Sequence, residues 1–504
     1  MTAAAQVAEL RQKGRVIHNI LCLILRQYQA EEKMPSRLIV VSNRIPLGAQ
    51  SAGGLVVALN DALAKSGGLW VGAHPETGNG ENALEEIGCK PFRRLAFRLT
   101  QNELQDYYLG LANSVLWPLF HRRPDLVRLN PDYNHAYRAV NSRIARLLAG
   151  IAGPDDLIWV HDYHLIPLAE ELRKLGLHNR IGFFLHIPFP VLADLTVLPE
   201  PDTFADNLAH YNLIGLQTRG DVARCLEMFR ADPRAEFMTD GTVKFRDRVT
   251  SVRSFPIGID VEAFQADAER EAANPFGSEQ ANNFIIGVDR LDYSKGIPNR
   301  FRAFGRYLET RPQGTRACLV QIAPPSRQDV QAYQDIRREL EEIAGRINGQ
   351  FAELDWTPIR YIHRSIDRTK LALLYRLARA CLITSLADGM NLVSKEYVAA
   401  QDPSDPGVLI LSRFAGAAED MTDALLINPY DTEAVAQAIG EALQMPLEER
   451  KRRYAGCFEV AQRTNASIWS TNFLHSLATC VPTLELATDE RPVFEWSSTD
   501  GSKK

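Results

Sequence analysis

The feature that most constrains the fold of this chain is a series of short, uninterrupted apolar runs separated by helical segments. Apolar runs of this kind, bounded by turn residues, are typical of strands buried in a parallel sheet. We expect strands at residues 38–42, 157–160, 181–185, 214–216, 284–288, 317–322, 381–384 and 408–411. We expect helices at residues 55–65, 165–175, 298–308, 329–347 and 370–378. This alternation predicts an α/β, doubly wound fold.

Composition limits the partners and the compartment. The 504 residues carry 57 Lys and Arg against 62 Asp and Glu, a net charge of −5. Without a basic block, this charge argues against a nucleic-acid-binding surface. The seven cysteines form no C-x-x-C pair, so neither a disulfide framework nor a zinc module is predicted. We therefore expect a protein of the reducing cytoplasm.

An apolar stretch at residues 16–25 precedes the first expected strand. It is too short to span a bilayer, and its flanks lack the small-residue cleavage site of a signal peptide. Its apolar residues recur at helical spacing, which predicts one amphipathic helix. We expect this helix to pack on its own protein or on a sister subunit. Membrane contact and a natural start at Met34 are the alternatives.

The common phosphate-binding loops are missing from the sequence. No G-x-x-x-x-G-K-[ST] segment occurs. One G-x-G-x-x-A segment lies at residues 78–83, but Glu76, Glu81, Glu85 and Glu86 surround it and would repel a pyrophosphate. We therefore reject a dinucleotide loop, and this argues against a dehydrogenase.

The segment VDRLDYSKG at residues 288–296 lies between an expected strand and an expected helix. Ligands of open α/β sheets bind at the carboxyl ends of the strands, where this turn is placed. Arg290 and Lys295 could converge there on one diphosphate, as a planar fork and a point charge. The alternative is that both are surface charges paired with Asp289 and Asp292.

The segment ADGMNLVSKEY at residues 387–397 follows another expected strand. Asp388 and Gly389 indicate a turn, and a helix should begin near Asn391. The free N–H groups of its first turn would form an anion site. Glu396 is itself anionic and suits the hydroxyls of a ribose. The alternative is that Glu396 only complements the helix dipole.

Titratable residues end two neighbouring strands, in HDYH at 161–164 and LHIPFP at 185–190. The carboxyl ends of parallel strands meet at one edge of a sheet, so these side chains should converge. Single histidines beside prolines more often make hydrogen bonds than bind metals. A metal site of His161, Asp162, His164 and His186 is the alternative.

Together these motifs resemble those of the retaining trehalose-6-phosphate synthases. The shared segments are SNR at 42–44, SAGG at 51–54, VLWP at 115–118, HDYH at 161–164, LHIP at 185–188, RLDYSKG at 290–296, VQAYQDIR at 330–337, GRIN at 345–348, DGMNLVSKE at 388–396 and AAQDP at 399–403. The resemblance runs in order through residues 37–477. It implies the GT-B fold, in which two Rossmann-like, doubly wound domains face a central cleft. It also implies transfer of glucose from a nucleotide sugar to glucose 6-phosphate, giving α,α-trehalose 6-phosphate.

We expect the chain to divide accordingly. Residues 1–35 would form a helical N-terminal extension, residues 36–255 an acceptor domain and residues 256–465 a nucleotide-sugar domain. Residues 466–482 would form a helix that crosses back to the first domain, and residues 483–504 a mobile tail.

The resemblance implies site residues position by position. Asp162, His186, Arg290 and Lys295 would be catalytic. The nucleotide sugar would be bound by Gly53, Gly54, His186, Arg290, Lys295, Ile366, Asp388, Asn391, Leu392, Val393, Ser394, Lys395 and Glu396. Glucose 6-phosphate would be bound by Arg44, Tyr108, Trp117, Asp162 and Arg327, with the two arginines on its phosphate.

The resemblance implies neither a metal nor another cofactor, and no covalent nucleophile is established in the family. Catalysis would then rest on positioning and electrostatics. UDP-glucose is the default donor, with GDP and ADP as open alternatives. We expect a homo-oligomer, either dimer or tetramer, whose product is dephosphorylated by a separate phosphatase. Two alternatives remain: a related transferase acting on glycerol 3-phosphate or a cyclitol phosphate, and a catalytically silent sugar-phosphate sensor.

Overall fold

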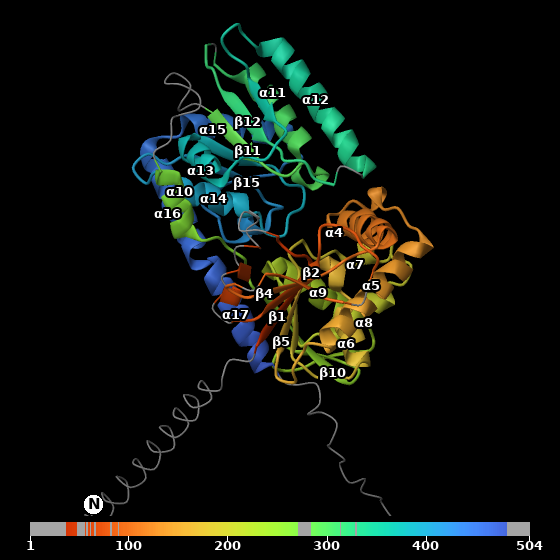
Figure 1. Cartoon of the computed structure of the whole chain (residues 1–504). Helices are drawn as coiled ribbons and strands as arrows, with labels where there is room; N and C mark the ends of the chain where they lie inside the picture. The colour runs from red at the N-terminus through yellow and green to blue at the C-terminus, as the bar shows by residue number, and fades with distance from the viewer. Residues whose placement is uncertain are drawn as a thin grey trace, which may run out of the picture.

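The computed structural model describes residues 37–47, 56, 59–60, 62–64, 67–80, 83–88, 90–270, 284–312, 314–327 and 330–480. These residues form two α/β lobes, one above the other in Figure 1. The expected extension at 1–35 and the expected tail at 483–504 lie outside the described residues, as do Gly53 and Gly54.

The first lobe is built on a ten-stranded sheet, in the order β3-β4-β2-β1-β5-β6-β7-β10-β9-β8. The strands from β4 to β10 in that order pair in parallel, and antiparallel pairs lie at both edges. The strands are β1 Leu38–Arg44, β2 Leu69–Ala73, β3 Glu85–Gly88, β4 Arg93–Phe97, β5 Leu157–His161, β6 Ile181–Phe184, β7 Leu213–Leu216, β8 Ala235–Phe237, β9 Val243–Phe245 and β10 Arg248–Ser254.

The second lobe is built on a six-stranded, all-parallel sheet, in the order β13-β12-β11-β14-β15-β16. Its strands are β11 Phe284–Val288, β12 Cys318–Ile322, β13 Ile359–Ile362, β14 Ala380–Ile383, β15 Val408–Ser412 and β16 Leu425–Ile427. The central strands β11, β14 and β15 are buried along their whole length. Helices on both faces of this sheet account for that burial.

Helices cover the two sheets and connect their strands. In the first lobe they are α3 Gln101–Glu103, η1 Leu104–Leu116, α4 Trp117–Phe120, η2 Pro124–Leu126, α5 Pro131–Ala149, η3 Tyr163–Leu165, α6 Leu168–Lys174, α7 Leu192–Leu195, α8 Asp202–Ala209 and α9 Arg219–Arg230. Those that follow are α10 Val261–Glu269, η4 Tyr293–Lys295, α11 Ile297–Thr310, α12 Gln331–Phe351, α13 Arg368–Leu377, α14 Leu392–Ala400, η5 Gly416–Glu419, α15 Thr432–Gln444, α16 Leu447–Arg463 and α17 Ala466–Thr479.

The expected strands and the expected helices within the described residues are confirmed, whereas the helix expected at residues 16–25 lies outside them. Every strand predicted from an apolar run is present, with its ends within two residues of the predicted ones. The predicted helices from residue 165 onward are also present, and the described residues of the segment 55–65 are helical. No helix in the described part of the chain is long and apolar enough to cross a membrane.

Two segments of chain join the lobes. The first runs from β10 through residues 255–259 into α10, and the second leads from α16 into α17. They touch at Gly258, where a Cβ atom would collide with the main chain of Thr464. The backbone N–H of Ala466 donates to the carbonyl of Ile259 at 3.3 Å. The two crossings therefore form a single junction.

Helix α17 returns from the second lobe to the first, as Figure 1 shows. Its Phe473 is fully buried and stacks on Trp159 of β5, with ring centroids 4.6 Å apart. The ring occupies the space over Gly182 and Gly215, where added Cβ atoms would collide with it. These two glycines therefore let the helix lie close to the first sheet.

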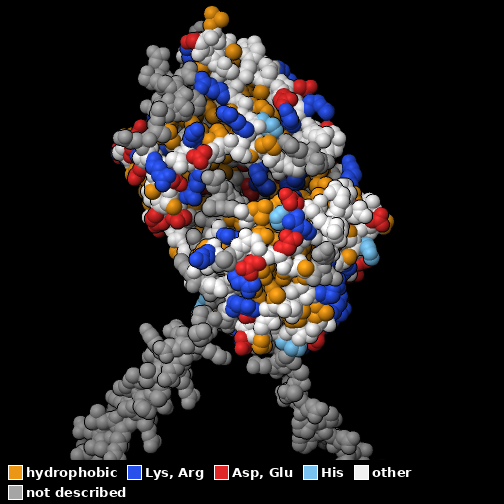
Figure 2. All heavy atoms as spheres, viewed as in Figure 1, with side chains coloured by type: hydrophobic (Ala, Val, Ile, Leu, Met, Phe, Trp, Pro, Cys, Tyr) orange, Lys and Arg blue, Asp and Glu red, His pale blue; other side chains and the backbone are white. Residues whose placement is uncertain are grey.

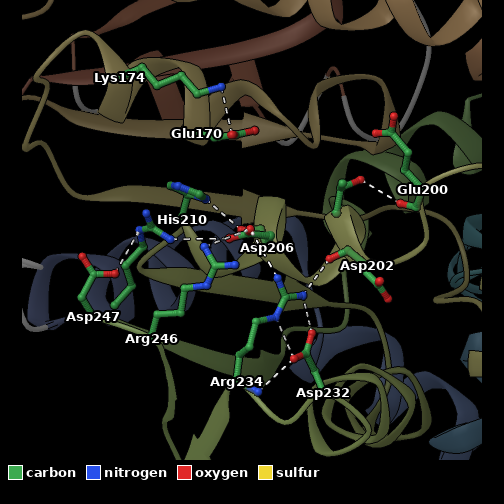
Figure 3. A network of polar contacts seen from close by, with 12 residues as sticks. Glu170, Lys174, Glu200, Asp202, Asp206, His210, Asp232, Arg234, Arg246 and Asp247 are labelled. Carbon is green, nitrogen blue, oxygen red and sulfur yellow. Dashed lines mark hydrogen bonds and ion pairs between the residues drawn. The ribbon is translucent and has the colours of Figure 1, made fainter.

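A polar network fastens α8 to the edge of the first sheet. Asp206 lies 3.5–3.7 Å from the guanidinium groups of Arg234, Arg246 and Arg248 (Figure 3). His210, one turn further along, bonds to the carbonyl of Asp206 at 2.8 Å. This network contains none of the expected site residues, so its role is structural.

Candidate functional site

The expected site residues come from the carboxyl ends of both sheets and from the segments that follow them. In the first lobe they follow β1, β4, β5 and β6, and in the second they follow β11, β12, β13 and β14. Figure 2 shows the molecule hollowed between the two lobes, with Lys and Arg side chains visible there. Ligands of open α/β sheets bind at such edges.

Arg44 ends β1 and is exposed. Its guanidinium carbon lies 4.5 Å from the ring centroid of Tyr108. The hydroxyl of Ser42 donates to the Arg44 carbonyl and accepts the indole N–H of Trp70, both at 2.8 Å, which holds the end of the strand. Stacking on an aromatic face leaves the N–H groups of an arginine available to an anion.

Tyr108 lies on a π-helix, η1, and Trp117 directly follows it. The Asn113 amide donates to the carbonyl of Tyr108 at 2.8 Å, and the Ser114 hydroxyl donates to the carbonyl of Leu109 at 2.7 Å. Side chains thus bond to main-chain carbonyls five residues earlier in this widened helix. π-helical segments are frequent at functional sites, and this one carries two residues expected at the acceptor site.

Arg327 connects the two lobes. In the first lobe its guanidinium stacks 3.6 Å from the ring centroid of Trp117 and donates to the Tyr163 hydroxyl at 3.3 Å. In the second lobe it donates to Asp292 at 3.1 Å and to the Tyr333 hydroxyl at 2.7 Å. This expected acceptor residue is therefore held in place from both sides.

The two aspartates of the VDRLDYSKG segment do not pair with its cations. Asp289 forms an ion pair with the buried Arg300 at 2.7 Å, and Asp292 pairs with Arg327. The alternative that Arg290 and Lys295 are surface charges neutralised by these two carboxylates is therefore wrong.

Lys295 instead forms an ion pair with Asp388, with Nζ 2.6 Å from a carboxylate oxygen. Asp388 also accepts from Ser385 at 3.2 Å and from the Asn391 amide at 3.0 Å. Burial opposes ionisation of Asp388, but the charge and hydrogen bond of Lys295, together with the hydrogen bond from Asn391, outweigh it and lower the pKa of the carboxyl. The structure thus joins the two segments that the sequence predicts at the donor site.

Arg290 is exposed beside the acceptor residues. Its guanidinium carbon lies 5.7 Å from the ring centroid of Trp117. Trp117 is therefore near a cation expected to hold the diphosphate and also near Arg327, expected to hold the sugar phosphate. The expected donor and acceptor groups adjoin at this ring.

Helix α14 begins after Asn391, as predicted. Asn391 has φ +80° and caps the helix, since its side-chain oxygen accepts the N–H of Ser394 at 3.0 Å. The hydroxyl of Ser394 donates to the Asn391 carbonyl at 2.7 Å. Leu392 and Val393 are partly buried in the first turn.

Glu396 lies on the same helix and is partly buried. It accepts a hydrogen bond from the Tyr375 hydroxyl at 3.3 Å. Burial raises the pKa of Glu396 to about 7, although the hydrogen bond from Tyr375 acts in the opposite direction. Because burial disfavours its ionised form, this carboxylate would be stabilised by a ligand whose hydroxyl groups donate hydrogen bonds to it.

The side chain of Lys395 turns away from the nucleotide-sugar site. It is only 1% exposed, and its ammonium donates to the Ile257 carbonyl at 2.6 Å and to Thr464 at 2.9 Å. Binding of the nucleotide sugar by Lys395 stays a prediction, and it would involve the main chain of this residue. Its ammonium holds the junction of the two lobes instead.

Asp162 follows β5 with φ +76°, a conformation that is costly for a residue with a side chain. Its carboxylate accepts the backbone N–H of His186 at 3.3 Å. Burial raises the pKa of Asp162 to about 6, opposed by that hydrogen bond and by the charges of Arg327 and Arg290. Strain and desolvation of this kind favour a functional role.

The histidines of the alternative metal site are committed to other contacts. Nδ1 of His161 lies 3.1 Å from Nε2 of His186. His164 packs against the rings of Tyr108 and Tyr163, with centroids 5.8 and 4.0 Å away. Among the described residues, no group of three or more His, Cys, Asp or Glu side chains could hold a metal ion.

Ile366 precedes α13 and packs against the core of the second lobe. Gly53 and Gly54 remain predictions, because the described residues do not include them.

Several residues that position the site were missed by sequence reasoning. They are Tyr163 and Tyr333 on Arg327, Asp292 on the same arginine, and Tyr375 on Glu396. Three of them lie inside the segments of resemblance, at 161–164, 290–296 and 330–337. Membership of those segments was the available signal, but it does not identify their partners.

Comparison with known proteins places this geometry among characterised folds. The family model described as glycosyltransferase family 20 matches residues 35–479. The trehalose-6-phosphate synthase of Sodalis glossinidius is 44% identical over 449 residues, covering 88% of this chain and 96% of its own. That of Klebsiella pneumoniae is 43% identical over 462 residues, covering 89% and 97%.

Solved structures agree with these relatives. An E. coli structure bound with UDP-2-fluoro glucose matches with a TM-score of 0.86 at 44% identity, covering 89% of this chain and all of its own. An α,α-trehalose-phosphate synthase (UDP-forming) from Burkholderia xenovorans, in complex with glucose-6-phosphate, matches with a TM-score of 0.83 at 42% identity. It covers 88% of this chain and all of its own.

Proposed function

Because the chain belongs to glycosyltransferase family 20, we propose that it is a retaining glycosyltransferase that makes α,α-trehalose 6-phosphate. The fold is GT-B. The enzyme transfers glucose from UDP-glucose to glucose 6-phosphate and releases UDP. Its relatives include a structure bound with a UDP-glucose analogue and another in complex with glucose-6-phosphate.

The observation that carries this function is the arrangement of four cations around Trp117 and Asp388. Arg327 and Arg290 lie 3.6 and 5.7 Å from the Trp117 ring, and Lys295 pairs with Asp388. Arg44 stacks on Tyr108 of the helix that leads to Trp117. Two phosphorylated substrates meeting at one reaction centre require such a divided set of cations.

On the acceptor side, Arg44 and Arg327 bind the phosphate of glucose 6-phosphate. Tyr108 and Trp117 form the apolar wall of that pocket. Asp162 lies where the reacting hydroxyl of the acceptor is held, and accepts a hydrogen bond from it. Because Asp292 and two tyrosines already fix Arg327, its guanidinium is ordered before the substrate arrives.

On the donor side, Arg290 and Lys295 bind the diphosphate and stabilise the negative charge on the departing UDP. In the free protein Lys295 is neutralised by Asp388 at 2.6 Å. A bound diphosphate competes for that ammonium, which frees the Asp388 carboxylate to accept hydroxyl hydrogens of the donor glucose. The first turn of α14 and Glu396 bind the nucleotide, with Glu396 on the ribose and Ile366 near the base. Gly53, Gly54 and His186 complete the site from the first lobe.

We propose that the leaving group is stabilised by these side-chain cations rather than by a metal, and that no further cofactor takes part. Two positive charges at the diphosphate supply the electrostatic stabilisation that a divalent cation gives elsewhere. Addition of EDTA should therefore leave the rate within about twofold, an allowance for ionic effects. Strong inhibition that is restored by a divalent metal would contradict this point.

The function is tested by nucleotide release. The assay compares UDP-, GDP- and ADP-glucose, each with and without glucose 6-phosphate, and identifies the disaccharide phosphate product. We expect UDP release that depends on glucose 6-phosphate. Release driven only by glycerol 3-phosphate or a cyclitol phosphate would assign a different acceptor. Binding of sugar phosphate without turnover would indicate a sensor.

We propose that the enzyme works in the cytoplasm as a homo-oligomer and that a separate phosphatase acts on its product. The cysteines of the described residues are all free, as in a reducing compartment. Light scattering coupled to size exclusion measures the oligomer directly. A strictly monomeric protein would contradict the assembly.

A further inference from the structure

A buried pair of histidines lies at the carboxyl ends of β5 and β6. Nδ1 of His161 and Nε2 of His186 are 3.1 Å apart, and the two rings are inclined by only 24°. His161 has no exposed surface, whereas His186 is only partly buried. In such a contact one nitrogen must carry a proton and the other must offer a lone pair.

Both imidazoles are neutral at working pH. Burial lowers the pKa of His186 to about 3, and it lowers the pKa of His161 well below its ordinary value. A single proton therefore lies between the two rings. The ring that holds it decides which hydrogen-bonding group His186 presents on its other nitrogen.

The surroundings of the second nitrogen of His161 decide the direction of this bond. Nε2 of His161 is buried and has no hydrogen-bond partner in the described part of the chain. The ring centroids of Trp159 and Trp469 lie 4.6 and 6.3 Å from that of His161. Their indole nitrogens are donors that likewise lack partners among the described residues, so they offer no acceptor.

A proton on Nε2 of His161 would thus be a buried N–H without an acceptor among the described residues. Buried N–H groups without a partner are rarer in proteins than under-satisfied acceptors. A lone pair at the same place is therefore the more favourable arrangement. The proton of His161 therefore belongs on Nδ1, from which it is donated to Nε2 of His186.

We propose that His161 is a positioning residue that fixes His186 in the tautomer with its proton on Nδ1. The remaining nitrogen of His186 is then an N–H donor, and it requires an oxygen acceptor on the donor glucose. This inference rests on the proposed function, which places the donor glucose against His186. The pair also prevents His186 from changing tautomer, so only a sugar with a lone pair at that position is held.

The tautomer is measured directly in the free protein by long-range ¹H–¹⁵N correlation on histidine labelled with ¹⁵N. We expect a protonated Nδ1 and an unprotonated Nε2 for both His161 and His186. Spectra of His161→Phe and His186→Phe assign the signals. A proton on Nε2 of His186 would overturn the proposal, whatever the enzyme's activity.

The consequence for binding is measured with His161→Phe, which keeps an aromatic ring in the core but removes the donor. Loss of a residue that orients a ligand-binding histidine typically costs about 10–100-fold in affinity or activity at metal sites. We expect a loss of about tenfold in affinity for UDP-glucose, with the Kd of UDP alone and the KM of glucose 6-phosphate unchanged. His161→Asn keeps an N–H close to the position of Nδ1 and should recover most of the affinity.

His210→Phe is the matched control, because it removes another buried histidine that bonds only to a neighbouring carbonyl. It should leave UDP-glucose affinity unchanged. Equal losses in both variants, or loss of UDP binding in His161→Phe, would show a structural role and overturn the proposal. If His161→Phe does not fold, the spectrum of the native protein decides alone. A protein without transferase activity would contradict the proposed function, and the spectrum would still test the tautomer.

Discussion

Lys295 and Asp388 show how single residues of this site act on each other before substrate is present. Their ion pair, with side chains 12% exposed, keeps a buried charge neutralised until a diphosphate replaces the carboxylate. A buried charge that loses its only partner is strongly destabilising. The pair is therefore a stable resting state for two groups that we propose act on the donor.

Lys295→Ala removes the charge that we propose stabilises the departing UDP. We expect kcat to fall by about 100-fold or more, the loss typical of removing one such electrostatic donor. Lys244→Ala, at a partly buried lysine on β9 that pairs with Glu236, is the control and should not change kcat. Near-normal turnover in Lys295→Ala would remove this lysine from the mechanism.

Arg44→Ala tests the acceptor phosphate site. The KM for glucose 6-phosphate should rise by about 10–100-fold, since a charge-assisted hydrogen bond is worth about 1.5–3 kcal/mol. The KM for UDP-glucose should stay the same. Arg146→Ala, at an exposed arginine of α5, should change neither constant. A selective loss of UDP-glucose affinity would instead place Arg44 at the donor.

Arg327→Ala should also raise the KM for glucose 6-phosphate, and in addition it should lower the thermal stability of the protein. It leaves the fully buried Asp292 without its cation, and breaking one side of a buried ion pair costs about 3–5 kcal/mol. The melting temperature therefore distinguishes Arg327→Ala, which should be destabilised, from Arg44→Ala. An Arg327→Ala protein with the melting temperature of the wild type would contradict the structural part of this role.

Glu396 gives the stability a definite dependence on pH. Its pKa is raised by burial from 4.5 to about 7. The folded protein therefore binds more protons than the unfolded chain between these values, and stability falls as pH rises through them. The effect approaches about 3 kcal/mol. Between pH 5 and 8, the melting temperature of the wild type should fall further than that of Glu396→Gln.

Binding of UDP-glucose should change in the opposite direction, because the ionised carboxylate is the better acceptor for ribose hydroxyls. Affinity should increase up to about tenfold between pH 6 and 8, as the ionised fraction grows. The phosphates of a nucleotide sugar do not titrate in this range. An equal increase in Glu396→Gln would remove Glu396 from the ribose site.

Among the elements, α17 is the one that packs the end of the second lobe against the first sheet. It belongs in sequence to the end of the second lobe, yet Phe473 and Trp469 pack against Trp159 and Phe184 of the first sheet. Stacking of Phe473 requires Gly182 on β6 and Gly215 on the neighbouring strand β7. The helix therefore completes the core of the first lobe and brings apolar rings close to the histidine pair.

Phe473→Ala should lower the free energy of unfolding of the first lobe by about 3–5 kcal/mol, the usual cost of removing a buried phenylalanine. Urea unfolding followed by the fluorescence of the buried tryptophans measures it. Phe237→Ala removes a phenylalanine that is 41% exposed on edge strand β8, and should cost much less. Similar losses in the two variants would contradict the importance of this packing.

At the scale of the whole molecule, the proposed substrate sites are divided between the two lobes, and two crossings connect the lobes in the described part of the chain. Arg290, Lys295 and Asp388 come from the second lobe, whereas Arg44 and His186 come from the first. A site divided in this way is complete only when the lobes are close together. The junction at 255–259 and 464–466, held by Lys395, is the place about which they would turn.

Binding of UDP together with glucose 6-phosphate should therefore make the protein more compact. Small-angle X-ray scattering should show a smaller radius of gyration in the ternary complex than in the free enzyme. Lys395→Met removes the ammonium that bonds to both crossings and should weaken this ligand-induced change. The same radius with and without both ligands would contradict closure.

The sequence alone determined the local structure and the identity of the chemical groups. Short apolar runs predict buried strands, because a parallel sheet covered on both faces admits little else. Turn residues after those runs place Arg290, Asp388 and Asp162 at strand ends, where ligands of α/β sheets bind. The resemblance of whole segments then assigned these groups to a donor and an acceptor.

Only the tertiary structure decided which of these groups pair and which are desolvated. Lys295 bonds to Asp388, 93 residues away, rather than to the aspartate three positions before it. Lys395 turns to the junction although its neighbour Glu396 bonds to Tyr375. Charge interactions and pKa values depend on distance and burial. Both are set by segments that meet only in the folded chain, and so no local pattern of residues contains them.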